Sequence, residues 1–206
     1  MSRGTLDRRA VVGRLLAGRG DLLVVAGLGA PAWDITAAGD HPLSFPLWGG
    51  MGGAAMMGLG LALAQPRRRV LVVTGDGEML MGLGSLATIA VQRPRNLSIV
   101  VLDNERYGET GMQRTHTAHG VDLAGIARAA GFPRALRIAT MTGVSRLTRL
   151  VHDGTGPVFA QVKVSPARAP LVLPPKDGER LKQRFRDALR AGRGPNAASR
   201  PAAGPS

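Results

Sequence analysis

The chain has 206 residues and no cysteine, which excludes disulfide bonds and thiolate metal sites. Its formal charge of +13 is concentrated at the two ends, since residues 1–20 contribute +4 and residues 165–206 contribute +6. Aromatic side chains do not alternate with these charges, as a surface that stacks single-stranded bases would require, so nucleic-acid binding is only a minor alternative.

Apolar strands and helical stretches alternate along the chain. Strands are predicted at residues 21–27, 43–48, 68–77, 96–104, 135–140 and 156–164. Helices are predicted at residues 51–65, 79–92, 121–131 and 143–152. Continuous apolar runs are typical of strands that are buried on both faces of a parallel sheet. The alternation therefore predicts an α/β fold: a doubly wound, mainly parallel sheet with helices on both faces.

The pattern changes after Val164. "SPARAPLVLPP" is a Pro-rich linker, "KDGERLKQRFRDALRAG" is typical of one charged helix, and the remaining residues have the composition of a disordered basic tail. We expect a folded domain at residues 1–165, and the linker, helix and tail at residues 166–206.

Two further features bear on location. The first 21 residues lack the apolar core and cleavage site of a signal peptide. The longest apolar segment, residues 51–64, is too short and too rich in glycine to span a bilayer. We therefore expect a soluble cytoplasmic protein with no membrane partner.

The most informative residues follow two neighbouring predicted strands. Asp76 lies between Gly75 and Gly77 after one strand, and Asn104 ends the next. Doubly wound sheets bind ligands beyond the carboxyl ends of their strands, so both side chains are expected at the same edge. One carboxylate and one amide oxygen suit Mg²⁺, which takes its other ligands from phosphate and water. The glycines allow close backbone approach to a phosphate, and a helix starting near Glu78 adds unpaired N–H groups. An isolated Gly-Asp-Gly would more simply cap a helix.

Residues 20–165 resemble the diphosphate-binding domain of thiamine-diphosphate-dependent enzymes. Three segments carry the resemblance, in order and at matching distances: "GGMGGAAMMGLGLALA", "GDGEMLMGLGSLATIA" and "LDNERYGETGMQRTHT". The sequence is most similar to the β subunits of sulfopyruvate and phosphonopyruvate decarboxylases, which carry this domain alone. The resemblance implies that thiamine diphosphate and Mg²⁺ are the cofactors.

The same resemblance assigns roles to individual residues. It implies that Asp76, Asn104 and the main-chain carbonyl of Arg106 bind the metal. It places Met51 beneath the cofactor, where it would force the two rings into a bent conformation, and a carbonyl near Gly49 against the aminopyrimidine. The further cofactor contacts that we expect are Gly75, Gly77, Glu78, Tyr107 and Gly108.

Two residues depart from the family pattern. Asp103 stands where an Asn is common, although the following ligand, Asn104, is retained. Glu78 stands where a small residue is common, and its charge would repel the diphosphate unless it points away or meets a cation.

The loop at residues 106–117 gathers polar side chains just beyond the expected metal site. Gln113 and Arg114 could bind a substrate carboxylate or a second anionic group, and His116 could donate a proton. A solvated loop is an equally good interpretation of these three residues.

In most of this family a Glu from a separate pyrimidine-binding domain activates the cofactor. The four glutamates here are Glu78, Glu105, Glu109 and Glu179, and none is at a position suited to that role. We therefore expect a hetero-oligomer with a pyrimidine-binding α subunit that carries the catalytic Glu, and little activity without it.

The expected reaction is decarboxylation of a small 2-oxo acid. Alternatives with the same chemistry are a carboligase or an acyl-transferring enzyme, and a non-catalytic scaffold or regulator is the alternative of another class.

Overall fold

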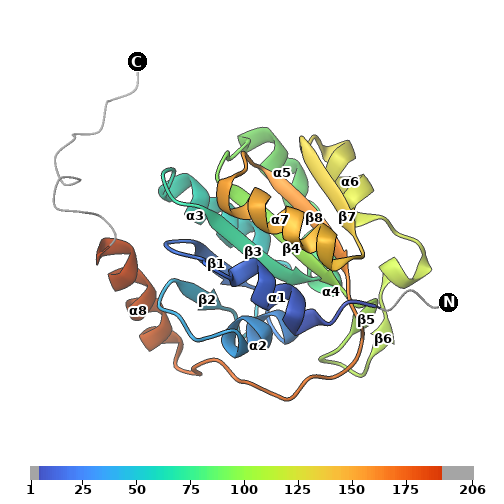
Figure 1. The fold of residues 1–206 in the computed structure, drawn as a ribbon, viewed down its shortest axis with the longest axis horizontal. Helices are drawn as coiled ribbons and strands as arrows, with labels where there is room; N and C mark the ends of the chain where they lie inside the picture. Colours follow the sequence, from blue (N-terminus) through green and yellow to red (C-terminus); the bar gives the residue numbers. More distant parts are fainter. Residues whose placement is uncertain (1–4, 192–206) are drawn as a thin grey trace.

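The computed structural model describes residues 5–191. Its centre is a sheet of six parallel strands in the order β2-β1-β3-β4-β8-β7 (Figure 1). These strands are β1 (Leu23–Ala26), β2 (Ser44–Pro46), β3 (Val70–Gly75), β4 (Leu97–Asp103), β7 (Arg134–Ile138) and β8 (Val158–Lys163). All six coincide with predicted strands, and the doubly wound α/β fold is confirmed.

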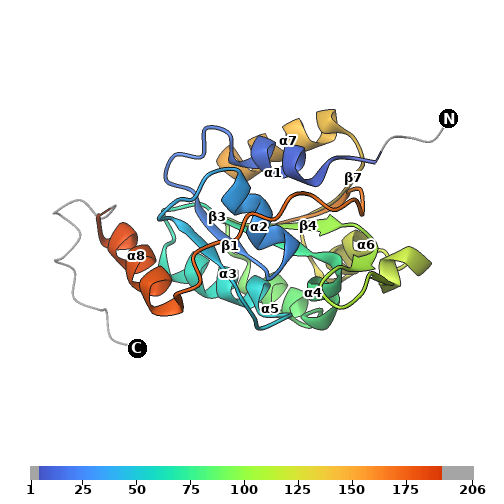
Figure 2. The same ribbon diagram turned by 90° about the horizontal axis from the view of Figure 1, so that it is seen from below.

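Helices cover both faces of the sheet, as Figure 2 shows from below. One layer contains α1 (Arg8–Leu16), α2 (Ala30–Ala37) and α7 (Met141–Asp153). The other contains α3 (Ala54–Ala64), α4 (Asp76–Met81), α5 (Ser85–Gln92) and α6 (Leu123–Ala130). The remaining elements are the short strands β5 (Arg106–Tyr107) and β6 (Gln113–Arg114), the 3₁₀ helix η1 (His116–His119), and α8 (Gly178–Ala191).

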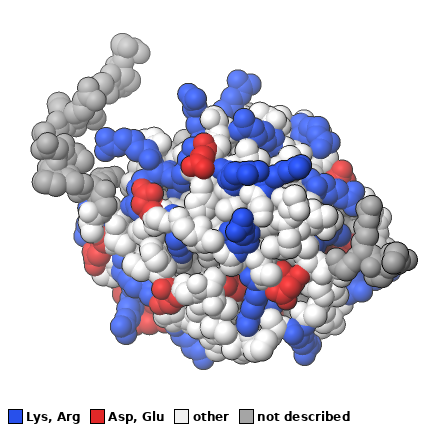
Figure 3. Space-filling model, in the orientation of Figure 1, with Lys and Arg blue, Asp and Glu red and all other residues white. Residues whose placement is uncertain are grey.

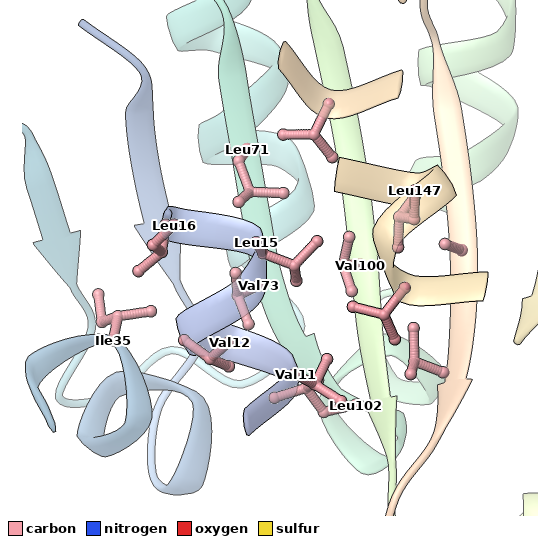
Figure 4. Packing of buried hydrophobic residues seen from close by; sticks show 14 of the residues in the cluster. Val11, Val12, Leu15, Leu16, Ile35, Leu71, Val73, Val100, Leu102 and Leu147 are labelled. Carbon is pink, nitrogen blue, oxygen red and sulfur yellow. The ribbon is translucent and has the colours of Figure 1, made fainter. Parts of the chain in front are cut away.

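Alternate residues of the central strands supply the two hydrophobic cores. Leu71 and Val73 of β3 face the side of α1 and α7 and belong to the same core as Leu15 of α1 and Leu147 of α7 (Figure 4). Val72 faces the opposite core, beneath α3 and α5. Each fully buried aliphatic side chain contributes roughly 1.5–3 kcal/mol relative to an exposed one. Burial on both faces therefore explains why the strands are continuously apolar.

The predicted helix at residues 79–92 is divided in the structure. Helix α4 begins three residues earlier and ends at Met81, and α5 begins at Ser85. The break coincides with the closest approach to the segment before α3, because a Cβ atom at Gly82 would lie 2.3 Å from the Gly52 carbonyl oxygen. The two glycines thus bring the beginning of α3 and the end of α4 together.

Two helices at the start of the chain were not predicted from the sequence. Helix α1 begins after Asp7, whose side chain accepts a hydrogen bond from the Ala10 amide at 2.7 Å as an N-cap. Helix α2 follows Gly29, whose φ of 74° lies in the left-handed region that favours glycine.

The C-terminal helix packs on the edge of the sheet. The expected charged helix forms α8, and the rings of Phe185 and Phe45 of β2 lie 5.5 Å apart, centroid to centroid. Arg184 donates to both oxygens of Asp40 at 2.6 and 2.9 Å. The segment 165–177 joins β8 to α8 along the carboxyl edge of the sheet (Figure 1). The predicted tail from residue 192 onward lies outside the described residues.

Within residues 5–191, none of the helices combines the length and the apolar character that crossing a bilayer requires. The cytoplasmic location stays a prediction.

Candidate active site

A cavity of about 650 Å³ lies at the carboxyl edge of the sheet. Most of the predicted cofactor and metal residues line it: Met51, Gly75, Asp76, Gly77, Glu78, Asn104, Arg106, Tyr107 and Gly108. Its volume falls within the range of roughly 300–1,000 Å³ that is usual for small-molecule sites.

The pairing of β3 with β4 brings the two informative strand ends together. Gly75 is the register partner of Leu102, so Asp76 and Asp103 follow at equivalent positions on neighbouring strands. Asp76 begins α4 and only 1% of its surface is exposed. Asn104 comes next after Asp103 and lines the same cavity. The expected convergence of Asp76 and Asn104 on one cavity is therefore observed.

Two threonine hydroxyls hold the Asp76 carboxylate. Thr115 and Thr117 donate to its Oδ2 atom at 2.5 and 3.1 Å, and neither bonds Oδ1. Burial raises the pKa of Asp76, the Thr115 hydroxyl opposes that rise, and the charge of Asp103 adds to it. A nearby cation would offset this burial penalty, because it favours the ionised carboxylate.

Asp103 is the centre of a buried polar cluster. Its carboxylate accepts hydrogen bonds from Thr117 at 2.8 Å, Gln161 at 2.6 Å and Lys163 at 2.9 Å. The single hydroxyl proton of Thr117 is therefore shared between Asp103, the nearer acceptor, and Asp76. For Lys163, burial lowers the pKa, but hydrogen bonds to Glu105 and Asp103 outweigh this and raise it. Asp103, which departs from the family pattern, is thus paired with Lys163, and it shares this cation with Glu105.

Asn104 and Arg106 belong to one tight turn. The Asn104 Oδ1 atom accepts a hydrogen bond from the Arg106 amide at 2.9 Å, which leaves a second lone pair on that oxygen. Glu105 between them has a φ of 61°, a conformation that is uncommon for a residue other than glycine. The surrounding bonds therefore hold a strained backbone beside the expected metal ligands.

The glycines of the Gly-Asp-Gly motif have different environments. A Cβ atom at Gly77 would lie 2.5 Å from the Tyr107 ring, so glycine is required there for Tyr107 to pack against the backbone. No atom lies within 4 Å of a Cβ built at Gly75. The space beside Gly75 is therefore open to a ligand.

Glu78 is turned toward the protein interior. Its carboxylate accepts hydrogen bonds from the Thr74 hydroxyl at 2.7 Å and the Ala54 amide at 3.3 Å, and it occupies the place where a Cβ atom of Gly27 would be. Burial raises its pKa, and the bonds from Thr74 and Ala54 oppose that rise. These bonds direct the charge into the domain, although the residue still borders the cavity.

Some residues of the cavity were not predicted from the sequence. Arg8, at the start of α1, lines the cavity and pairs with buried Asp34. Glu109 also lines it, and burial raises the pKa of its carboxyl while the charge of Arg8 opposes that rise. Residues of the 165–177 segment form another wall: Pro166, Ala167, Arg168, Ala169 and Leu171.

Only some of the unpredicted residues in and around the cavity could have been found from the sequence. Gln161 and Lys163 are polar residues within an apolar strand, a pattern that indicates a buried polar contact. Arg8 and Arg168 are 160 residues apart and have no motif that links them to the site.

The remaining predicted site residues lie outside the cavity lining. Gln113 and Arg114 are exposed in β6, and His116 is exposed in η1. The Arg114 guanidinium donates to the Ala118 carbonyl at 2.7 Å. Gly49 is exposed and lies two residues before Met51, which does line the cavity. The roles of these four residues stay predictions.

The donor set at this edge fits an ion that shares its coordination with a ligand. Within residues 5–191, no group of three or more His, Cys, Asp or Glu side chains is placed to hold a metal ion. One carboxylate, one amide oxygen and a main-chain carbonyl leave coordination positions of Mg²⁺ for phosphate oxygens and water.

Residues 30–162 match the family described as "Thiamine pyrophosphate enzyme, C-terminal TPP binding domain". The sulfopyruvate decarboxylase subunit beta of Methanothermobacter thermautotrophicus is 41% identical over 180 residues, which cover 87% of this chain and 94% of that protein. The phosphonopyruvate decarboxylase of Streptomyces viridochromogenes is 38% identical over 77% of this chain but only 40% of its own length. The crystal structure of benzoylformate decarboxylase from Polynucleobacter necessarius has the same fold over 81% of this chain and 34% of its own, with a TM-score of 0.66 and 19% identity.

Proposed function

The chain belongs to the family of thiamine pyrophosphate enzymes that share the C-terminal TPP-binding domain, and from this we propose that it is the diphosphate-binding subunit of a heteromeric 2-oxo acid decarboxylase. The proposed substrate class is a small 2-oxo acid with a second anionic group, such as sulfopyruvate or phosphonopyruvate, which the names of the relatives suggest. The observation that carries the proposal is the convergence of Asp76 and Asn104 on one cavity.

The residues that would hold the cofactor fit its diphosphate end. Mg²⁺ would take the Asp76 carboxylate, the Asn104 amide oxygen and the Arg106 carbonyl as ligands. Oδ1 of Asp76 is not used by the two threonines, and the space beside Gly75 is open. When bound, thiamine diphosphate supplies the nucleophilic carbon and the electron sink that decarboxylation of a 2-oxo acid requires.

The chain's own residues would orient the cofactor and exclude water. Thr115 and Thr117 fix the Asp76 carboxylate, and the buried cluster around Asp103 fixes the loop that carries Asn104. Met51 lines the cavity in keeping with its predicted place beneath the cofactor rings. Leu28, Leu102 and Met112 also line the cavity, and such apolar walls strengthen the electrostatic interactions inside it.

We propose that a pyrimidine-binding partner supplies the catalytic Glu. Three of the glutamates in this chain are engaged elsewhere: Glu105 pairs with Lys163, Glu179 pairs with Lys182, and Glu78 is held by Thr74. Glu109 is the fourth and lines the cavity without a salt-bridge partner within residues 5–191. Glu109 is therefore the residue of this chain that could take the role of the catalytic Glu in place of a partner's residue. A Glu109→Gln variant of the assembled enzyme would distinguish the two.

Cations beside the cavity suit an anionic substrate. Arg8 and Arg168 line the cavity, and Gln113 and Arg114 remain candidates at its exposed side. A guanidinium binds a carboxylate, sulfonate or phosphonate through paired hydrogen bonds. The same residues would serve a carboligase or an acyl-transferring enzyme, so those alternatives stand beside decarboxylation.

Replacement of Asp76 by Ala tests the proposal. Loss of a metal ligand should weaken Mg²⁺-dependent binding of thiamine diphosphate by at least about 100-fold, since even a residue that supports a ligand is worth about 10- to 100-fold. Calorimetric titration of the chain, alone and with its partner subunit, measures this effect. The matched control is Asp153→Ala at the exposed end of α7, which should leave binding unchanged.

Two outcomes would contradict the proposal. Unchanged binding in the Asp76→Ala variant would refute the ligand assignment. An unaltered chain that binds no cofactor, with or without the partner, would favour the scaffold alternative.

A further inference from the structure

Arg8 and Arg9, neighbours at the start of α1, share one buried carboxylate but direct their charges to different places. The Nε atom of Arg8 donates to Oδ2 of Asp34, and the Nε atom of Arg9 donates to Oδ1 at 3.3 Å. Arg9 also donates from Nη2 to the Pro170 carbonyl. Arg8 makes no second hydrogen bond within residues 5–191 and lines the cavity, which Arg9 does not. Asp34 therefore holds two guanidinium groups, of which only that of Arg8 is presented to the cavity.

The guanidinium of Arg8 is suited to a second, charged partner. Asp34 takes only its Nε atom, so the two Nη atoms remain available. A guanidinium presents its N–H groups in a planar fork that matches two oxygens of a carboxylate, sulfonate or phosphonate. The side chain of Asp34 has no exposed surface and that of Arg8 is 11% exposed, so this fork is already ordered in the empty cavity. Binding of an anion would therefore cost little side-chain freedom.

Arg168 brings a second positive charge to the same cavity. Apart from the proposed metal ligands and the inward-turned Glu78, the charged residues that line the cavity are Arg8, Glu109 and Arg168. Arg168 is exposed and forms no salt bridge within residues 5–191. This part of the lining thus carries two guanidinium groups against one carboxylate, which favours a ligand with a negative group.

Two observations favour the substrate over the cofactor as the source of this negative group. The family model matches residues 30–162, and both Arg8 and Arg168 lie outside that range. The diphosphate is common to the family, so its binding needs no residue beyond the common domain. The sulfopyruvate decarboxylase subunit beta aligns with this chain over 180 residues, which is longer than the range of the family model, and sulfopyruvate carries a sulfonate besides its 2-oxo acid.

We propose that Arg8 selects a substrate with a second anionic group, a sulfonate or phosphonate, and that Asp34 is its positioning residue. This inference rests on the function proposed above. Arg168, which is exposed, would add a weaker attraction for the same group. A 2-oxo acid without the second anion, such as pyruvate, would leave the two Nη atoms of Arg8 without a partner and would be selected against.

Arg8→Gln and Arg9→Gln are matched variants, because both remove a guanidinium from Asp34 but only the first changes the cavity lining. Each variant is assembled with the natural pyrimidine-binding subunit, thiamine diphosphate and Mg²⁺, and kcat/KM is measured for sulfopyruvate and for pyruvate. The preference is the ratio of these two values. Arg8→Gln should lower it at least about 10-fold, as expected for loss of hydrogen bonds between charged groups. Arg9→Gln should change it by less than about threefold, since its guanidinium does not reach the cavity.

A second measurement needs no turnover. Sulfoacetate has a carboxylate and a sulfonate but no oxo group, and acetate lacks the sulfonate. In calorimetry, the assembled enzyme with its cofactors should bind sulfoacetate at least about 10-fold more tightly than acetate, and Arg8→Gln should remove most of that difference. The affinity for thiamine diphosphate should stay unchanged in the Arg8→Gln variant.

Three results would overturn the proposal. Equal binding of sulfoacetate and acetate by the natural enzyme would show that no site for a second anion exists. Weaker binding of thiamine diphosphate by Arg8→Gln at an unchanged preference would assign Arg8 to the diphosphate. Equal loss of the preference in Arg8→Gln and Arg9→Gln would show that either arginine acts only by supporting the structure around Asp34.

The two measurements separate this inference from the proposed function. Binding of sulfoacetate that depends on Arg8, in an enzyme that decarboxylates neither acid, would support the anion site and refute the function. Decarboxylation of sulfopyruvate with a preference that Arg8→Gln leaves unchanged would do the reverse.

Discussion

The two sides of the sheet have similar cores but opposite outer surfaces. Beneath α1 and α7, as beneath α3 and α5, buried aliphatic residues pack on the strands. On the outside, α1 and α7 carry exposed arginines such as Arg14, Arg146 and Arg149, and Figure 3 shows basic side chains scattered over that side. The exposed residues of α3, α4 and α5, such as Met57, Leu63 and Val91, include no Asp, Glu, Lys or Arg, and we call this surface the uncharged face. The comparison shows that one outer surface has the charged side chains of an ordinary solvated surface, whereas the other lacks them.

The largest expected effect contrasts a buried leucine with an exposed one. Leu15→Ala removes a fully buried side chain from the core beneath α1 and should lower the free energy of unfolding by about 2–5 kcal/mol. Leu63→Ala on the uncharged face should change it by less than about 0.5 kcal/mol in the isolated chain. Urea unfolding measures both. Equal losses would mean that Leu63 already belongs to the core, and the comparison of the two sides would break down.

The next effect concerns charge on the two outer surfaces. Met57→Glu together with Leu63→Glu should weaken binding to the pyrimidine-binding subunit about 100-fold, or about 2.8 kcal/mol, because carboxylates would be buried without partners. The stability of the isolated chain should be nearly unchanged, since both positions are exposed. Calorimetry measures the affinity, with Arg149→Glu as the matched control. Equal weakening by the control would show that overall charge, and not the surface, governs docking.

The smallest effect concerns Glu78, which lies beneath the uncharged face. Burial raises its pKa above the ordinary value of 4.5, so the unfolded chain ionises first as the pH rises. Stability of the isolated chain should therefore fall as the pH rises from 4.5 through the pKa of the folded state. The Glu78→Gln variant has no carboxyl to ionise at this position. In urea unfolding it should therefore be more stable than the natural chain at pH 7 and equally stable at pH 4. An advantage that does not depend on pH would refute this account.

The Glu78→Gln variant also tests whether the charge of Glu78 affects cofactor binding. If the inward hydrogen bonds to Thr74 and Ala54 keep the charge away from the diphosphate, Glu78→Gln should change thiamine diphosphate affinity by less than about threefold. A variant that binds thiamine diphosphate much more tightly would mean that Glu78 opposes cofactor binding.

The sequence was sufficient for the sheet and for the two informative strand ends. Strands buried on both faces, such as β3 and β4, give unbroken apolar runs, and the carboxyl ends of neighbouring parallel strands meet at one edge. The family motifs added Met51 and Tyr107, and both line the cavity.

The sequence was not sufficient where distant segments meet. Thr115 and Thr117 bond Asp76 from about 40 residues away because the hairpin β5–β6 folds back over α4, and no periodic pattern encodes that return. The break between α4 and α5 depends on Gly82 meeting Gly52, which is again a contact between distant segments. Helix α1 was missed because it is short and its charged residues obscure the apolar positions at residues 11, 12, 15 and 16.

The segment after β8 has a consequence for any engineered form of this protein. Leu6 forms a bridge with Val164, and the Ser165 amide donates to the Leu6 carbonyl at 2.8 Å, so the beginning and the end of the folded core are tied to each other. Just beyond this tie, Arg8 on one side and Arg168 on the other reach the cavity. Trimming the chain to residue 165, or removing residues up to Arg8, would take away part of the cavity wall. A shortened form should therefore keep residues 5–191, which include both of these cavity walls and the helix α8 that packs on the edge of the sheet.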